Sequence, residues 1–212
     1  MVRYVAFMAA LAVAGIVPQA ATAPVFAQDA PTECASAYWL ESPATDTDAD
    51  DATPAVITEP APDWLKTELT DACTGKMFAL TDFAGKTIYI ETMATWCPPC
   101  RDQLRRVKAA AAQIPEEERQ EIVFVALSSE VDLPHETLAE YAESNDFPFI
   151  FAVMSAEMLR AMVEDLGQEI AVPPATPHVI VAPDGTVGEV HTGSISAEEL
   201  LALLAETEEA AT

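Results

Sequence analysis

The chain has 212 residues; half of them are apolar, and 35 acidic residues against ten basic ones give a net charge of −25 at pH 7. This length can form one well-buried domain with appendages. The negative charge argues against binding to nucleic acid or anionic membrane surfaces, and no apolar run reaches the roughly 18 residues of a transmembrane helix.

Residues 1–27 have the features of an export signal. Arg3 is their only charged residue, and the apolar stretch from Val5 to Val17 has the length of a signal core. Val25-Phe26-Ala27 places small residues where a signal peptidase reads the chain, which predicts cleavage before Gln28 or a few residues earlier. The mature protein is then periplasmic or otherwise extracytoplasmic. An uncleaved N-terminal membrane anchor remains the alternative.

Residues 28–62 predict an acidic tail or linker rich in Pro, Ala and Thr. Between Glu41 and Pro60 the chain carries six acidic residues and no basic residue. Such a composition cannot bury enough apolar surface to offset the entropy lost on ordering. The folded domain is therefore expected at residues 63–212.

Within this domain, short apolar runs alternate with segments of helical pattern. The continuous apolar run from Ile122 to Leu127 is typical of a parallel strand buried on both faces, and Asp184-Gly185 is a hairpin signal. The order predicts an α/β fold with a central mixed sheet flanked by helices. We expect strands at 77–80, 87–90, 122–127, 147–153, 177–182 and 187–191, and helices at 101–113, 134–143, 155–166 and 196–206.

The motif that carries chemistry is Trp96-Cys97-Pro98-Pro99-Cys100, between a predicted strand and a predicted helix. A helix N-terminus offers unpaired N–H groups and the positive end of the helix dipole, and both favour a thiolate. Cys97 can then attack a substrate disulfide, and Cys100, one turn further on, can resolve the mixed disulfide. Half of a zinc site or an inert disulfide are the alternatives, and the strand–CxxC–helix setting fits neither of them well.

The segment from Leu80 to Cys100, LTDFAGKTIYIETMATWCPPC, resembles the TlpA/ResA-like branch of extracytoplasmic thioredoxin-like proteins. The dipeptide Thr176-Pro177, with the VIVAPDGTV segment just after it, resembles the cis-proline strand and D-G hairpin of the same branch. The resemblance covers about Trp64 to Glu206. It implies a thioredoxin-like fold with an N-terminal extra strand pair and a βα insertion at Val131 to Leu166.

The resemblance also implies roles for individual residues. Cys97 matches the nucleophile, Cys100 the resolving thiol and Pro177 a cis-proline opposite the sulfurs; cis X–Pro bonds are a minority state. Thr176 would offer its backbone to an extended substrate segment. The substrate-binding surface is accordingly assigned to Trp96, Pro98, Pro99, Thr176 and Pro177.

Glu91 lies six residues before Cys97, at the position where thioredoxins hold a buried acid beneath the second cysteine. Many members of the TlpA/ResA-like branch lack an acid there. Burial raises the pKa of a carboxyl group, and such a group could take the proton of Cys100. We therefore assign Glu91 to the catalytic group. A solvent-facing Glu91, or one paired with Lys86, is the alternative.

Cys34 and Cys73 are the remaining cysteines. Unpaired cysteines are uncommon in exported proteins, so a structural Cys34–Cys73 disulfide that ties the tail to the domain is our expectation. A bond between two molecules, or a redox relay to Cys97 and Cys100, remains open.

These features predict a thiol–disulfide oxidoreductase that needs no cofactor or metal and acts as a monomer on exported proteins with thiols or disulfides. A reductant is favoured, with a membrane thiol protein as electron donor; the resemblance implies clients of cytochrome maturation or copper-site thiols. The alternative is a copper-binding chaperone of the thioredoxin fold, using the two cysteines, His178 and nearby methionines.

Overall fold

The computed structural model describes residues 61–210. The predicted export signal at 1–27 and nearly all of the predicted linker lie outside the described residues, so both stay predictions. In the part of the chain that is described, no helix is both long and apolar enough to cross a membrane.

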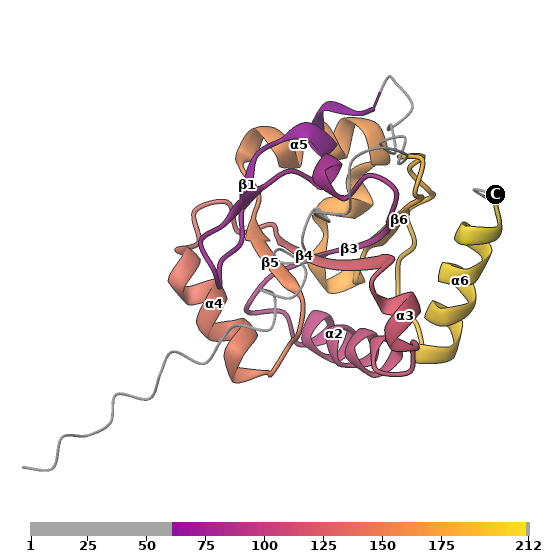
Figure 1. Ribbon diagram of the computed structural model, residues 1–212. Coiled ribbons are helices and arrows are strands. Elements are labelled where there is room, and N and C mark those ends of the chain that lie inside the picture. The colour runs from indigo at the N-terminus through magenta and orange to yellow at the C-terminus, as the bar shows by residue number, and fades with distance from the viewer. Residues whose placement is uncertain (1–60, 211–212) are drawn as a thin grey trace, which may run out of the picture. The chain divides into compact units, whose positions relative to one another are not determined.

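The centre of the domain is a four-stranded sheet with the order β5–β4–β3–β6 (Figure 1). The strands are β3 (Thr87–Met93), β4 (Ile122–Ser128), β5 (Ile150–Val153) and β6 (His178–Val181). β3 pairs in parallel with β4, and β4 with β5, whereas β6 runs antiparallel to β3. The sheet is therefore mixed, as the sequence predicts.

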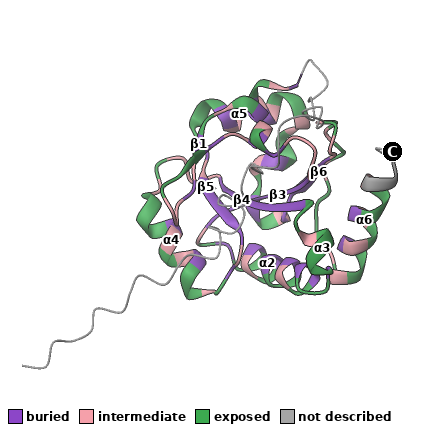
Figure 2. Ribbon diagram, viewed as in Figure 1, coloured by how far each residue is buried: buried purple, intermediate pink, exposed green. Residues whose placement is uncertain are grey.

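The two middle strands are buried along their whole length, which explains their continuous apolar sequences. All seven residues of β3 and all seven of β4 are buried. In Figure 2 the strands are mostly purple, while the helices around them carry green on their outer faces. The only strongly polar side chain that β3 contributes to this interior is Glu91, which marks the position as exceptional.

Side chains alternate between the two faces of the sheet, and each face has its own core. Tyr89 and Met93 face the helices α2 (Pro98–Ala111), α4 (His135–Ser144) and α6 (Ala197–Ala210). Ile88 and Ile90 face α5 (Ala156–Leu166) and the 3-10 helix η1 (Asp63–Lys66). This second core also contains three methionines that the sequence offered as a copper surface; all are buried, so they serve as packing residues: Met154, Met158 and Met162.

The N-terminal strand pair is present, but its members differ from those expected. Strand β1 (Leu69–Thr70) pairs antiparallel with β2 (Met77–Phe78). Residues Leu80–Phe83, expected to begin inside a strand, form the 3-10 helix η2, in which the Asp82 carboxylate accepts a hydrogen bond from the Ala79 N–H. The segment expected at 87–90 is the central strand β3 and runs on to Met93.

Each outer strand of the sheet is paired over one or two residues with another segment of the same chain. Beside β5, Asp71 forms a bridge with Ala152, and the Ala72 N–H donates to the Phe151 carbonyl. Beside β6, the segment expected as a strand at 187–191 forms only two isolated bridges, Val181 with Val187 and His178 with His191. Gly188 interrupts this segment, and glycine disfavours a regular strand.

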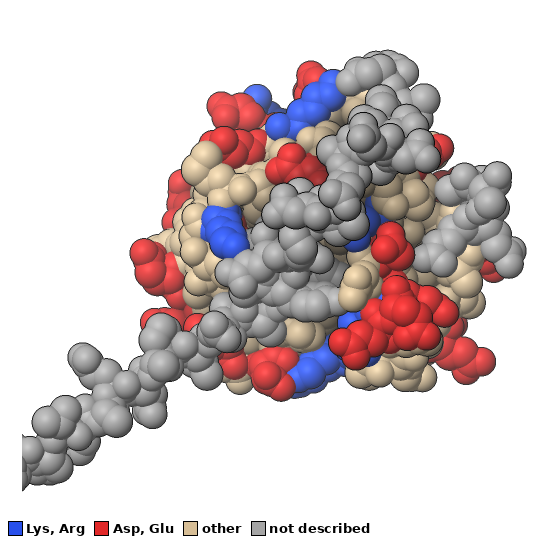
Figure 3. All heavy atoms as spheres, viewed as in Figure 1, with Lys and Arg blue, Asp and Glu red and all other residues tan. Residues whose placement is uncertain are grey.

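On the face shown in Figure 3, acidic side chains cover more of the surface than basic ones. One group lies on the short helix α3 (Glu116–Arg119), whose first turn consists of three glutamates. Two basic side chains of α2 are paired with acids: Arg105 with Asp102 at 3.0 Å, and Lys108 with Asp146 at 2.5 Å. Exposed pairs of this kind contribute at most about 1 kcal/mol each to stability.

Candidate active site

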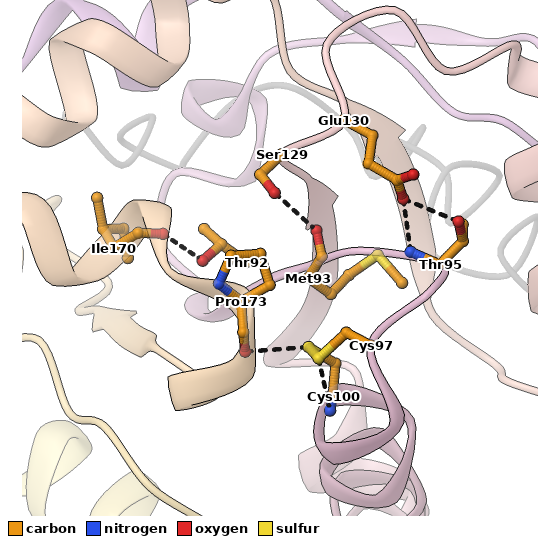
Figure 4. The surroundings of a disulfide bond; sticks show 9 residues. All are labelled: Thr92, Met93, Thr95, Cys97, Cys100, Ser129, Glu130, Ile170 and Pro173. Atoms are coloured by element: carbon orange, nitrogen blue, oxygen red, sulfur yellow. Dashed lines mark hydrogen bonds between the residues drawn. A yellow bond between two sulfur atoms is a disulfide. The ribbon is translucent and has the colours of Figure 1, made fainter.

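The site forms where β3 ends and α2 begins. Four residues after Met93, Cys97 serves as the N-cap of α2, and Cys100 lies in the first turn of the helix. The two cysteines form a disulfide with a sulfur–sulfur distance of 2.11 Å and a Cα–Cα distance of 5.4 Å (Figure 4). Both side chains are buried. The strand–CxxC–helix setting predicted from the sequence is therefore present.

The hydrogen bonding of Cys97 is limited by the two prolines. The Sγ atom of an N-cap cysteine can accept hydrogen bonds from the N–H groups of the second and third helical residues. Here the third residue, Cys100, donates its N–H to Cys97 Sγ at 3.2 Å. The second, Pro99, has no N–H to donate, and Pro98 occupies the first position. The helix terminus thus offers this sulfur fewer donors than a helix without prolines would.

The turn before Cys97 is held by a carboxylate from another strand. Glu130 follows the end of β4, and its Oε2 accepts hydrogen bonds from the Thr95 N–H at 2.6 Å and the Thr95 hydroxyl at 2.8 Å. Next to it, Ser129 donates to the Met93 carbonyl through its N–H and its hydroxyl. Figure 4 shows both residues on one side of this turn, Ser129 next to Met93 and Glu130 next to Thr95. The geometry of the segment leading to Cys97 therefore depends on residues more than thirty positions later.

Cys100 is covered by the loop between α5 and β6. This loop contains the 3-10 helices η3 (Gln168–Ala171) and η4 (Pro173–Ala175). The Pro173 carbonyl oxygen lies 3.0 Å from Cys100 Sγ, where it can accept a hydrogen bond from the thiol of the reduced protein. The loop is tied to β3 by Thr92, whose hydroxyl donates to the Ile170 carbonyl. Cys100 is thus enclosed and placed as an internal thiol.

Thr176 and Pro177, assigned to substrate binding, are both buried. Thr176 has φ 48° and ψ 53°, a left-handed conformation unusual for a β-branched residue. Its N–H donates to the Pro173 carbonyl at 2.7 Å, and its carbonyl oxygen lies 3.0 Å from His178 Nδ1. The backbone that was expected to pair with a substrate strand is therefore already bonded inside the loop. The cis geometry of the Thr176–Pro177 peptide stays a prediction.

Glu91 lies on the same face of β3 as Tyr89 and Met93 and is completely buried. This rules out the solvent-facing alternative, and Lys86 instead donates to the Gln120 carbonyl. Burial raises the pKa of the Glu91 carboxyl well above its ordinary value, although the Tyr89 hydroxyl, which donates to Glu91 Oε2 at 3.2 Å, works in the opposite direction. Burial therefore makes the Glu91 carboxyl harder to ionise than an exposed glutamate.

Two tyrosines complete the polar surroundings of Glu91. Burial, and then the neighbouring Glu91 carboxyl, raise the pKa of Tyr89 well above its usual range. Burial also raises the pKa of Tyr141, on α4, to about 12; the Arg101 guanidinium lowers it and Glu91 raises it. The Tyr89 hydroxyl donates to Glu91, whereas the buried Tyr141 hydroxyl has no hydrogen-bond partner among the described residues.

An apolar rim surrounds the disulfide. Trp96 is 62% exposed and Val172 is 47% exposed, which makes them two of the three large hydrophobic side chains most open to solvent in the described chain. Pro98, Pro99 and Pro174 are exposed beside them. Exposed apolar side chains next to a reactive group are typical of a protein-binding surface.

A family model described as Redoxin matches residues 25–204. The chain belongs to the Redoxin family. Comparison with curated protein sequences gives no significant match. The Redoxin match spans both sides of the CxxC motif and includes the loop that covers Cys100.

Solved structures share the fold of this Redoxin-family protein at low sequence identity. A secreted disulfide oxidoreductase of Mycobacterium tuberculosis, homologous to E. coli DsbE, is 17% identical with a TM-score of 0.53, covering 69% of this chain and 99% of its own. A thiol:disulfide interchange protein of Chlorobium tepidum is 19% identical with a TM-score of 0.52, covering 74% and 99%. ScoI of Arabidopsis thaliana, solved with copper bound, is 16% identical with a TM-score of 0.52, covering 68% and 96%. These similarities establish a thioredoxin-like fold.

Sequence reasoning about this Redoxin-family chain located the two cysteines, Glu91 and Trp96, but it missed three residues of the site. The place of Glu130 could have been predicted, because it follows a buried parallel strand and the carboxyl ends of adjacent parallel strands lie together. Pro173 and Val172 lie in a loop whose path follows no periodic pattern. Of the predicted structural pair, Cys73 is partly buried, and Cys34 lies outside the described residues. Within residues 61–210 no three His, Cys, Asp or Glu side chains gather as a metal site requires.

Proposed function

We propose that this protein is a thiol–disulfide oxidoreductase that works through Cys97 and Cys100 and acts as a reductant of exported proteins. The observation that carries the proposal is the Cys97–Cys100 disulfide at the N-terminus of α2, in a domain of the Redoxin family. A second observation supports it: an exposed apolar rim lies beside this disulfide, where a client protein can dock.

In the proposed reaction, the Cys97 thiolate attacks one sulfur of a client disulfide, and the other client sulfur leaves as a thiolate. The Cys100 thiol then loses its proton and attacks Cys97 Sγ. The Cys97–Cys100 bond forms, the mixed disulfide breaks, and the client is released in its reduced form. Two electrons pass from the protein to the client, and the protein ends in the oxidised state described above.

Glu91 is the group we assign to the proton of Cys100. It is buried on the face of β3 that packs against α2, in the same core as both cysteines. A carboxyl with a raised pKa is matched more closely to a thiol than an exposed one, so proton transfer between the two costs less. The raised pKa of Glu91 allows the carboxyl to accept this proton when Cys100 loses it.

The proposed reducing direction is supported by the small number of groups that stabilise a thiolate on Cys97. Strong oxidants of this type owe their high potential to a stabilised reduced form. At this site Pro99 removes one of the two backbone donors that an N-cap side chain can use. The Glu130 carboxylate is bonded to Thr95, two residues before Cys97. A negative charge at this place disfavours a thiolate on Cys97.

The test is the reduction potential of the Cys97–Cys100 pair. Full-length protein carrying C34S and C73S is equilibrated with glutathione or dithiothreitol buffers, and the oxidised fraction is read by alkylation and mass spectrometry. A value below about −220 mV supports a reductant, and a value near about −120 mV shows a disulfide donor instead. The absence of any reversible couple would refute the oxidoreductase.

Location and partners belong to the same proposal. The sequence of residues 1–27 supports export, and a membrane thiol protein would then supply the electrons. The clients would be exported proteins that hold disulfides, including those of cytochrome maturation or copper-site cysteines. Fractionation of cells that express the tagged chain tests the location, because a signal peptide predicts a processed, extracytoplasmic product.

Copper binding is the second candidate, and the structure gives it less support. The three methionines of the predicted copper surface are buried in the core. His178 is also buried, and its Nδ1 lies within hydrogen-bond distance of the Thr176 carbonyl. Titration of the reduced protein with Cu(I) in competition with a thiol ligand would reveal binding at the picomolar level if this function were the correct one.

A further inference from the structure

Three titratable side chains form a row across the sheet beneath the disulfide. Glu91 on β3 lies opposite His178 on β6 in the antiparallel register. His178 in turn exchanges two backbone hydrogen bonds with His191, His178 N–H to His191 O at 2.9 Å and the reverse at 2.8 Å. Side chains of opposed residues share one face of a sheet, with Cβ atoms about 5 Å apart.

The row leads from the interior of the domain to solvent. Glu91 is 0% exposed and His178 1% exposed, whereas His191 is exposed. The two imidazole rings stack with 5.6 Å between their centroids and an interplanar angle of 21°. Both histidines line a surface groove together with Glu199 and Glu206 of α6.

Two atoms in this row are buried without a hydrogen-bond partner among the described residues: Glu91 Oε1 and His178 Nε2. Buried polar atoms normally form hydrogen bonds, so an unpaired one requires an explanation. The Nδ1 atom of His178 lies 3.0 Å from the Thr176 carbonyl, which can only accept, so Nδ1 carries the hydrogen. In the neutral ring Nε2 is then an acceptor. It lies on the same face of the sheet as the Glu91 carboxyl, with no hydrogen bond between the two groups.

The pKa values of Glu91 and His178 are shifted in opposite directions. Burial raises the pKa of Glu91, whereas burial lowers the pKa of His178, which the Thr176 carbonyl partly offsets. An ordinary carboxyl and an ordinary imidazole differ by about two pKa units, with the carboxyl lower. From these ordinary values the two pKa shifts run towards each other, the direction that favours exchange of a proton between the groups.

We propose that His178 is a positioning residue for the thiol–disulfide reaction. Its Nε2 atom takes the proton from Glu91, and the ring passes the proton towards His191 and the groove. This rests on the function proposed above. When Cys100 is deprotonated, its proton goes to the Glu91 carboxylate. Transfer to His178 gives an imidazolium whose Nδ1–H stays on the Thr176 carbonyl, and loss of the proton to solvent through the groove restores the ionised Glu91.

The experiment separates the two thiol steps in the full-length chain carrying C34S and C73S. Reduced protein is mixed with an aromatic disulfide, 5,5′-dithiobis(2-nitrobenzoate), in a stopped-flow instrument. The first equivalent of coloured thiolate reports the attack by Cys97, and the second reports the attack by Cys100 on the mixed disulfide. Both rates are measured from pH 5 to pH 9.

The test variant is H178N, whose amide can still donate to the Thr176 carbonyl but cannot carry a proton. We expect the second phase to slow about tenfold and its pH profile to flatten, with the first phase unchanged within twofold. Exposed His135 on α4 supplies the matched control, and H135N should leave both phases unchanged. E91Q should slow the second phase by itself, and adding H178N to it should cost little more, since the residues act in series.

The pH profile is interpreted against every titratable group that faces His178. These are Glu91 and Tyr89 on β3, His191 on the edge segment, and Glu199 and Glu206 on α6. A second phase with the wild-type rate and pH profile in H178N would overturn the proposal. Equal slowing of both phases would also overturn it, because it would show a structural role. Failure of the wild-type protein to give either phase would instead count against the proposed function.

Discussion

Glu130 Oε2 accepts both the N–H and the hydroxyl of Thr95, so one carboxylate oxygen from the end of β4 fixes the turn that delivers Cys97 to α2. We expect E130A to lower the free energy of unfolding of the oxidised protein by about 1–3 kcal/mol, because the partly buried Thr95 N–H loses its partner. E130Q keeps an acceptor oxygen and should lose less than half as much. Urea denaturation measures both, and equal losses in the two variants would contradict this assignment.

Pro99 occupies the helical position whose N–H could otherwise reach Cys97 Sγ. P99A supplies this donor, and one extra hydrogen bond to a charged group is worth about 1.5–3 kcal/mol. The reduction potential should therefore rise by about 30–60 mV. P98A is the matched control, since an N–H at the first helical position does not bond to the cap, and its potential should stay near that of the wild type. A larger rise in P98A than in P99A would refute the argument.

Glu91 links stability to pH. Because burial raises its pKa in the folded protein, the folded state holds the proton at pH values where the unfolded chain has released it. The wild type should therefore lose stability relative to E91Q as pH rises above about 4.3, the ordinary value for Glu. The difference should reach on the order of 1–3 kcal/mol by neutral pH.

Denaturation of the oxidised wild type and E91Q at several pH values between 3 and 8 measures this difference. A constant offset between the two proteins would reflect packing alone, so the slope with pH is the test. E130Q, which removes an acid of the same site outside the interior, serves as the reference. A pH-independent difference for E91Q would show that the pKa of Glu91 is not raised in the folded protein.

Cys100 resolves the mixed disulfide in the proposed mechanism, so C100S should trap clients. A tagged C100S protein expressed in its own cells should form complexes that resist non-reducing electrophoresis and disappear with dithiothreitol. C97S should form far fewer, since the remaining thiol lies under the Pro173 carbonyl. If C97S trapped as many clients as C100S, the roles of the two cysteines would have to be exchanged.

Much of the fold was predictable because it depends on local patterns. The apolar run at 122–127 became β4, and the alternation of strands and helices gave the mixed sheet of a thioredoxin-like domain. Predictions were poorer where tertiary contacts decide. The 187–191 segment has the composition of a strand, yet Gly188 and its place at the sheet edge leave it with two isolated bridges.

The site divides in the same way. Cys97 and Cys100 are separated by only two residues and form a recognisable motif, so the sequence is sufficient to locate them. Glu91 was placed by its spacing from Cys97 along a single strand. Glu130 and Pro173 reach the site through the folding of distant segments, and no pattern near the cysteines identifies them. The bonded backbone of Thr176 likewise depends on the Pro173 loop.

The isolated bridges beside β5 and β6 have a consequence for how this protein meets other chains. A sheet with free edges is a template for self-association, and under the function proposed above this protein would meet many partly folded, strand-rich clients. Here Asp71 and the 187–191 segment occupy hydrogen-bonding positions on the two outer strands. A client is thereby directed away from the sheet margins to the apolar rim around Trp96, where a contact leads to disulfide exchange and release instead of to a growing aggregate.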